Sequence, residues 1–102
     1  MVVAEVSIFP LGTSSESVSD YVAAAVKELE GSGLRCTRGP MGTTVEAETL
    51  EEAYAAATRA QNAVFAMGAG RAYTTLKIDE RRDVGSRSTE DMMRSVDEKV
   101  DG

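Results

Sequence analysis

The sequence predicts an α+β sandwich with the element order strand, helix, strand, strand, helix, strand, followed by one more helix. Three observations predict it: short segments alternate apolar and polar residues, longer segments repeat apolar residues at helical spacing, and glycine-containing turns separate them. Strand–helix–strand crossovers are almost always right-handed, so both inner helices should cover one face of a four-stranded antiparallel sheet. The other face should be left bare.

The first strand is expected over residues 2–9, VVAEVSIF, and Pro10 and Gly12 end it. Its alternation assigns one face to Val2, Ala4, Val6 and Ile8 and the opposite face to Val3, Glu5, Ser7 and Phe9. Ser17 should then cap a helix, with Asp20 three residues later completing a capping box. The helix carries an apolar stripe made of Val18, Val22, Ala25, Val26 and Leu29.

Gly31 and Gly33 stop the first helix, and a hairpin follows them. Residues 34–38, LRCTR, alternate weakly and predict a strand at the sheet edge, and Gly39 to Gly42 form the turn. The return strand, TTVEAE, should direct Val45 and Ala47 to the core. The alternate residues, Thr44, Glu46 and Glu48, should then lie on the bare face.

The second helix is expected over residues 50–67, where Thr49 and Glu52 repeat the capping pattern. Its apolar face comprises Leu50, Ala53, Ala57, Ala60, Val64 and Met67. Gly68 and Gly70 end it. The run RAYTTLKID, 71–79, predicts the last strand, with one face made of Ala72, Thr74, Leu76 and Ile78 and the other made of Tyr73, Thr75, Lys77 and Asp79.

A short third helix is expected over residues 89–100, capped by Ser88. We expect it to dock on the protein's own surface through Met92, Val96 and Val100, which recur at helical spacing.

These elements correspond to a ferredoxin-like βαββαβ sandwich with an additional C-terminal helix, in a single domain over residues 2–100. Its first and third strands lie side by side in the centre, so Glu5 and Glu46 should share the bare face. If that face were exposed to solvent, two glutamates on it would need no functional explanation. Because Val3 and Phe9 share that face, it is better matched to a partner sheet, and partly buried carboxylates there would need donors or a cation.

Composition narrows the function. A net charge of −6 with a pI of about 4.6 argues against nucleic acid and anionic membranes as partners. The absence of histidine removes the usual general base and the commonest metal ligand, so we expect neither catalytic nor metal-binding residues. Cys36 is the single cysteine and is interpreted as a small buried hydrophobe. Without a basic leader or a long apolar run, the expected location is the cytoplasm.

Four segments occur in an order that resembles the thiamine-binding protein family: AEVSIFPLGT, SVSDYVAAAV, GPMGTTVE and TTLKIDERRD. The resemblance runs from residue 4 to about residue 100. It implies a non-enzymatic cytoplasmic protein that binds thiamine or its hydroxymethylpyrimidine half. It also implies a homotetramer, a dimer of dimers, with the ligand at or near subunit contacts and no further cofactor. A small core rich in alanine also favours oligomerisation.

Carried over position by position, the resemblance implies a ligand site made of Glu5, Thr13, Met41, Gly42, Thr43 and Glu46. The chemistry of these residues agrees in part. An aminopyrimidine presents an amino donor beside a ring nitrogen, which a carboxylate and a hydroxyl can match, while a thioether can lie against the ring.

Other interpretations remain open. The main alternative is a structural or regulatory oligomer whose sheet face is filled by its own partner and never by a small molecule. An RNA-recognition module would need aromatic residues where Glu5 and Glu46 stand. An acylphosphatase-like enzyme would need an arginine after the first strand, where PLGTSSE has none. The charges from Lys77 to Asp83 are interpreted as interfacial ion pairs.

Overall fold

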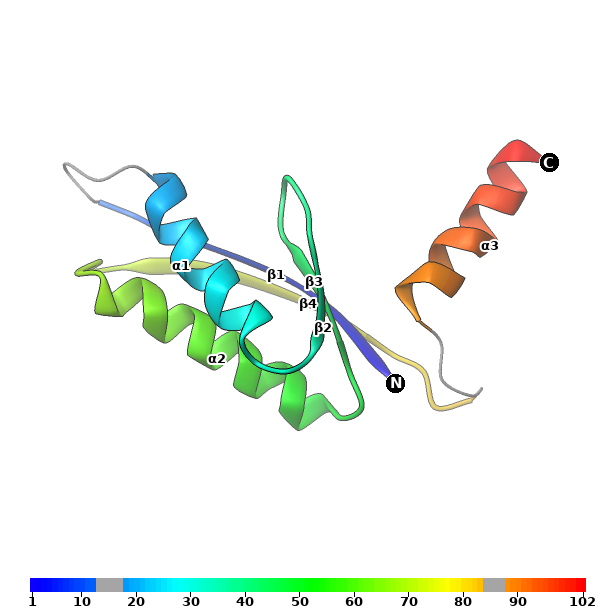
Figure 1. The fold of residues 1–102 in the computed structure, drawn as a ribbon, viewed down its shortest axis with the longest axis horizontal. Coiled ribbons are helices and arrows are strands. Elements are labelled where there is room, and N and C mark those ends of the chain that lie inside the picture. The colour runs from blue at the N-terminus through cyan, green and yellow to red at the C-terminus, as the bar shows by residue number, and fades with distance from the viewer. Residues whose placement is uncertain (13–17, 84–87) are drawn as a thin grey trace.

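The computed structural model describes residues 1–12, 18–83 and 88–102 and is a two-layer α+β sandwich with a protruding C-terminal helix (Figure 1). In chain order the elements are β1 (Val2–Pro10), α1 (Val18–Glu30), β2 (Arg35–Arg38), β3 (Thr43–Ala47), α2 (Leu50–Ala66), β4 (Ala72–Glu80) and α3 (Thr89–Asp101). The sheet order is β2-β3-β1-β4, and every neighbouring pair is antiparallel. This arrangement is consistent with the ferredoxin-like fold expected from the sequence.

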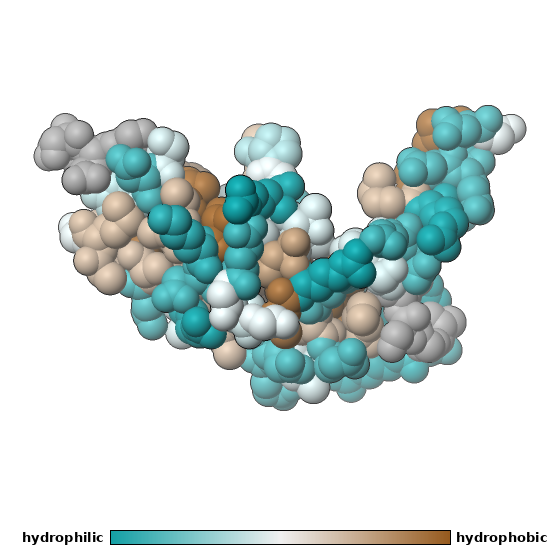
Figure 2. Space-filling model, in the orientation of Figure 1, coloured by the Kyte–Doolittle hydropathy of each residue, from teal (hydrophilic) through white to brown (hydrophobic). Residues whose placement is uncertain are grey.

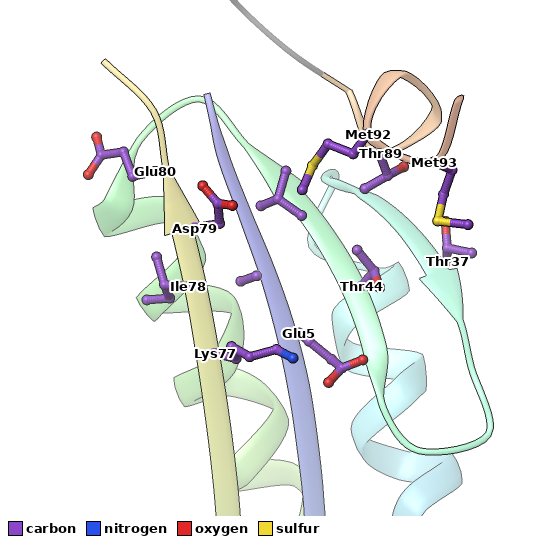
Figure 3. A pocket seen from close by; sticks show the side chains of 12 residues that line it. Glu5, Thr37, Thr44, Lys77, Ile78, Asp79, Glu80, Thr89, Met92 and Met93 are labelled. Atoms are coloured by element: carbon purple, nitrogen blue, oxygen red, sulfur yellow. The ribbon is translucent and has the colours of Figure 1, made fainter. Parts of the chain in front are cut away.

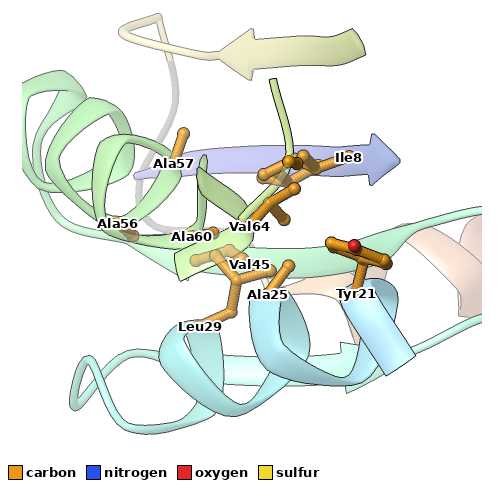
Figure 4. Packing of buried hydrophobic residues seen from close by; sticks show 11 residues of the cluster. Ile8, Tyr21, Ala25, Leu29, Val45, Ala56, Ala57, Ala60 and Val64 are labelled. Carbon is orange, nitrogen blue, oxygen red and sulfur yellow. The ribbon is translucent and has the colours of Figure 1, made fainter. Parts of the chain in front are cut away.

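The core lies between the sheet and the two inner helices (Figure 4). The alternation predicted for β1 is confirmed, because Val2, Ala4, Val6 and Ile8 are all buried. From α2 the core receives mostly alanines, namely Ala53, Ala56, Ala57 and Ala60, together with Val64. Small side chains let this helix lie close to the sheet, but each one buries little apolar surface.

The buried face of α1 differs from the predicted stripe. Tyr21, Ala25 and Leu29 form the buried row, whereas Val18 and Val22 are 51% and 38% exposed. The row that faces the core is the one containing the aromatic ring, whose burial removes more apolar surface from water than either valine would. Ser17, predicted to cap this helix, lies outside the described residues.

Both other predicted caps are confirmed. Thr49 and Glu52 form a capping box at the start of α2, and Ser88 and Asp91 form one at the start of α3. The strand before α2 ends one residue earlier than predicted, because β3 stops at Ala47. Glu48 is therefore an exposed residue of the connection.

The prediction that α3 docks through its apolar stripe is wrong for most of the helix. No residue of α3 is buried, and Val96 and Val100 are 53% and 75% exposed. Figure 1 shows the helix running away from the sandwich. Three apolar side chains make a thin stripe on a strongly charged helix, so the gain from burying it is small. Only its N-terminal end reaches the sheet, through polar contacts described below.

Candidate functional site

A hollow opens on the face of the sheet that α1 and α2 leave bare, between the strands and the start of α3 (Figure 3). We call it the sheet-face hollow; its volume is about 990 Å³. It is lined by Val3, Ala4, Glu5, Thr37, Thr44, Lys77, Ile78, Asp79, Glu80, Thr89, Met92 and Met93. All four strands contribute to this lining, so the hollow depends on the register of the whole sheet.

Glu5 lies on the central strand at the hollow. The register places it directly opposite Thr44 on β3 and Lys77 on β4. In the described part of the chain, no hydrogen bond or ion pair engages its exposed carboxylate. Figure 3 shows the Lys77 side chain extending from β4 toward β1 on the same face. The arrangement therefore offers a carboxylate acceptor beside an ammonium donor and a hydroxyl.

Glu46 shares the bare face, as predicted, but its environment differs. It is 8% exposed, and both of its carboxylate oxygens have partners within the chain. Oε1 accepts a hydrogen bond from the Thr89 backbone N–H at 2.6 Å, and Oε2 lies 3.3 Å from Nε of Arg35. A buried carboxylate needs such partners, because its desolvation is costly. Whether it also contacts a ligand stays a prediction.

The hairpin residues of the predicted site lie in a different depression. Met41, Gly42 and Thr43 line a groove of about 470 Å³ between α1 and the β2–β3 hairpin, which we call the hairpin groove. Figure 2 shows apolar side chains gathered between these two elements. Met41 is 82% exposed and Thr43 is buried at 3%. These residues are not brought into the lining of the sheet-face hollow.

Gly42 is the point at which the two depressions approach each other. A Cβ added there would lie 3.0 Å from Cγ of Glu5 and 3.2 Å from the carbonyl oxygen of Val6. The glycine therefore leaves room for the Glu5 side chain. Thr13, the remaining member of the predicted site, lies outside the described residues.

The charged residues after β4 are paired within the chain. Arg81 makes hydrogen bonds of 3.0 and 2.9 Å to Asp83, and Arg82 makes hydrogen bonds of 3.0 and 3.1 Å to Glu80. Through its hydrogen bonds, Arg82 holds the pKa of the Glu80 carboxyl below its usual range. Their role at an interface between subunits stays a prediction.

Three residues that line the hollow were not among the site residues expected from the sequence, namely Lys77, Met92 and Met93. A signal for Lys77 was present, because the alternation of the last strand already put it on the bare face beside the central strand. The two methionines had no such signal. They reach the hollow only through the placement of α3, and helical periodicity does not show where a helix lies relative to a sheet. In the described residues no group of His, Cys, Asp or Glu is placed to hold a metal ion.

Across residues 1–12, 18–83 and 88–102, no helix combines the length and apolar character that crossing a bilayer requires.

Comparison with known proteins gives concordant matches. A family model described as thiamine-binding protein matches residues 4–97. A UPF0045 protein of Methanothermobacter thermautotrophicus is 48% identical over 100 residues, covering 98% of this chain and all of that protein. The UPF0045 protein YqgV of Bacillus subtilis is 39% identical over 87 residues, covering 81% of this chain and 83% of YqgV.

Solved structures agree with the fold. The hypothetical protein MJ1052 of Methanocaldococcus jannaschii superimposes with a TM-score of 0.83 at 37% identity, covering 95% of this chain and 96% of that one. A Thermotoga maritima protein, provisionally described as a thiamine biosynthesis or salvage protein, superimposes with a TM-score of 0.77. It covers 93% of this chain and 97% of its own at 21% identity, so this likeness concerns the fold alone.

Proposed function

The chain belongs to the thiamine-binding protein family, and on that premise we propose that it binds thiamine or the hydroxymethylpyrimidine half of thiamine in the sheet-face hollow. Family membership supports a small-molecule-binding role, and neither the family description nor the names of the relatives point to an enzymatic activity. The observation that carries the proposal is the Glu5 carboxylate, which is exposed on the central strand without a partner among the described residues and has Lys77 and Thr44 on either side.

The chemistry of this group favours an aminopyrimidine. The amino group of the ring would donate to Glu5, while the neighbouring ring nitrogen would accept a hydrogen bond from Lys77 or from the hydroxyl of Thr44. A charge-assisted contact of this kind is stronger than one between neutral groups. Met92 and Met93 add thioethers, which make favourable contacts with aromatic rings.

We place the hollow at a subunit contact of a cytoplasmic homotetramer, a dimer of dimers. The support comes from the other end of the same face, where Phe9 and Tyr73 stack with ring centroids 5.3 Å apart. Tyr73 is 53% exposed, so the aromatic pair offers apolar surface to a second sheet. A hollow that is open in one chain would then be closed by its partner.

A structural or regulatory oligomer without a ligand is the second candidate. The contacts of Glu46 favour it, because this carboxylate, which a ligand could have neutralised, is already neutralised within the chain. The ligand-binding candidate predicts that removing the charge of Glu5 weakens ligand binding, whereas the oligomer without a ligand predicts no binding for Glu5 to affect.

Calorimetric titration of hydroxymethylpyrimidine and of thiamine into the wild type and into Glu5→Gln tests the proposal. The amide keeps the shape and removes the charge, so affinity should fall by about 1.5–3 kcal/mol, the range for hydrogen bonds to charged groups. Glu48→Gln is the matched control, because Glu48 is exposed and does not line the hollow. Equal affinity in all three proteins would remove Glu5 from the site, and no heat with either compound would favour the oligomer without a ligand.

A further inference from the structure

The N-terminal end of α3 is fastened to the sheet by the buried carboxylate of Glu46. Its Oε1 accepts from the N–H of Thr89, the first residue of α3, at 2.6 Å. Its Oε2 faces Arg35 at 3.3 Å, and the guanidinium of Arg35 is also paired with Glu90 in the first turn of α3. Two strands and one helix end therefore meet at a single carboxylate.

The physical chemistry of this contact makes it an anchor. The first N–H groups of a helix have no partner within the helix and carry partial positive charge, which a carboxylate stabilises. Glu46 in turn is 8% exposed and cannot rely on water. If α3 left the sheet, Glu46 would keep only Arg35, whose side chain is 60% exposed. Separation would replace the contact between the carboxylate and the positive helix end with weaker contacts to water on both elements.

The anchor holds two residues at the sheet-face hollow. Met92 and Met93 follow Thr89 within one turn of helix, and Figure 3 shows them above Thr37 and Thr44 on the hollow's α3 side. The remainder of α3 contributes little to its placement, because no residue of the helix is buried. The position of the two methionines thus depends on the contacts of the first turn.

We propose that Glu46 is a positioning residue, which holds α3 so that Met92 and Met93 form the apolar wall of the ligand site. In this arrangement the methionine thioethers touch the ligand and Glu46 does not. Two flexible thioethers opposite a polar floor select a planar heteroaromatic ring over an open-chain amine. The assignment of the wall rests on the function proposed above, whereas the anchor itself can be tested without any ligand.

Hydrogen exchange of the full chain, measured by mass spectrometry without ligand, tests the anchor. Glu46→Gln removes the charge and should speed exchange of the α3 amides by roughly ten-fold, because the hydrogen bond to Thr89 loses its charge assistance and the ion pair with Arg35 is lost. Exchange in β1 and α2 should not change. Glu48→Gln, two residues along, is the matched control and should behave as the wild type. Unchanged exchange of α3 in a folded Glu46→Gln protein would overturn the anchor.

A second variant tests the anchor in case the Glu46→Gln protein does not fold. Arg35→Gln changes an exposed side chain and removes the ion pairs to both Glu46 and Glu90. It should also speed exchange in α3, by a smaller factor, and its failure to do so would count equally against the anchor.

Titration of hydroxymethylpyrimidine into the wild type, two single variants and the double variant tests whether Met92 and Met93 form the apolar wall. Glu46→Gln and Met92→Ala should each weaken binding several-fold, and the double variant should bind no more weakly than the poorer single variant, because both changes remove the same wall. Val100→Ala on the same helix is the control and should bind as the wild type. Multiplied effects in the double variant would show that Glu46 contacts the ligand directly, which would overturn the proposal.

The proposed function and the anchor of α3 can be overturned independently of each other. If hydroxymethylpyrimidine does not bind the wild type, the proposed function and the wall are both overturned, while faster exchange in Glu46→Gln would still support the anchor. If it binds but α3 exchanges equally in all variants, the proposed function stands and the anchor is overturned.

Discussion

Glu5 and Glu46 are the same type of residue on adjacent strands, yet their carboxylates have opposite environments. The register pairs Glu5 with Thr44 and pairs Glu46 with Val3, so the two are offset by one step along the same face. One is exposed and has no partner among the described residues, whereas the other is buried with two. The difference comes from Arg35, which lies opposite Glu46 on β2, and from Thr89, which is 43 positions away from Glu46 in the chain.

The surroundings of Cys36 disfavour the thiolate form of its side chain. Its Sγ donates to the carbonyl oxygen of Leu29 at 3.2 Å. Burial raises the pKa of the Cys36 thiol, and the negative charge of Glu30 raises it further. Less thiolate is therefore present near neutral pH than in a free cysteine, and the thiolate is the reactive form.

We expect iodoacetamide to alkylate Cys36 more slowly in the folded protein than in urea at the same pH, with the rate rising as pH rises. Mass spectrometry of quenched time points measures both rates. Alkylation as fast as in the unfolded chain would contradict the interpretation of Cys36 as a structural residue.

At the scale of elements, the turn after α2 depends on one glycine conformation. Gly68 has φ of 100° and follows the C-cap residue Met67, and its N–H donates to the carbonyl oxygen of Phe65 at 2.9 Å. An added Cβ would meet nothing within 4 Å. The cost of a side chain at this position is therefore backbone strain alone.

We expect Gly68→Ala to lower the free energy of unfolding by about 1–2 kcal/mol. Gly70→Ala is the matched control, since its Cβ also has open space and the residue is not among those with positive φ. It should be neutral or slightly stabilising, because alanine restricts the unfolded chain. Denaturant unfolding of both variants measures the difference. Equal losses would show that strain at Gly68 is not the cause.

Local sequence patterns predicted some features of the helices and not others. The capping residues Thr49 and Ser88 could be predicted, because a cap depends on side chains three residues apart. The buried row of α1 could not, since two adjacent rows both carry apolar residues and the packing against α2 and the sheet selected the row with Tyr21. The placement of α3 depends on a contact with β3, which periodicity does not encode.

At the scale of the whole molecule, the fold could be predicted from the sequence, and the lining of the candidate site only in part. Strand alternation and two crossovers determine which face the helices cover, so the side of the sheet that carries Glu5 followed from the sequence. The division of the predicted residues between two depressions did not follow. Met41 belongs to the hairpin groove because the hairpin turn faces α1, and that geometry depends on the twist of the sheet.

The bare face should be the surface through which the chain assembles. We expect the wild type, a chain of 10.8 kDa, to sediment as a tetramer at micromolar concentration and Tyr73→Glu to give smaller species, because a charge beside Phe9 would be buried without a partner. Tyr54→Glu is a matched control: Tyr54 is 52% exposed and Tyr73 is 53% exposed, but Tyr54 lies on α2, which covers the opposite face. Both changes add the same charge to an acidic chain, so general repulsion would affect them equally. Dissociation by Tyr54→Glu alone would move the interface to the helices, and a wild type that sediments only as a monomer would refute assembly through either face.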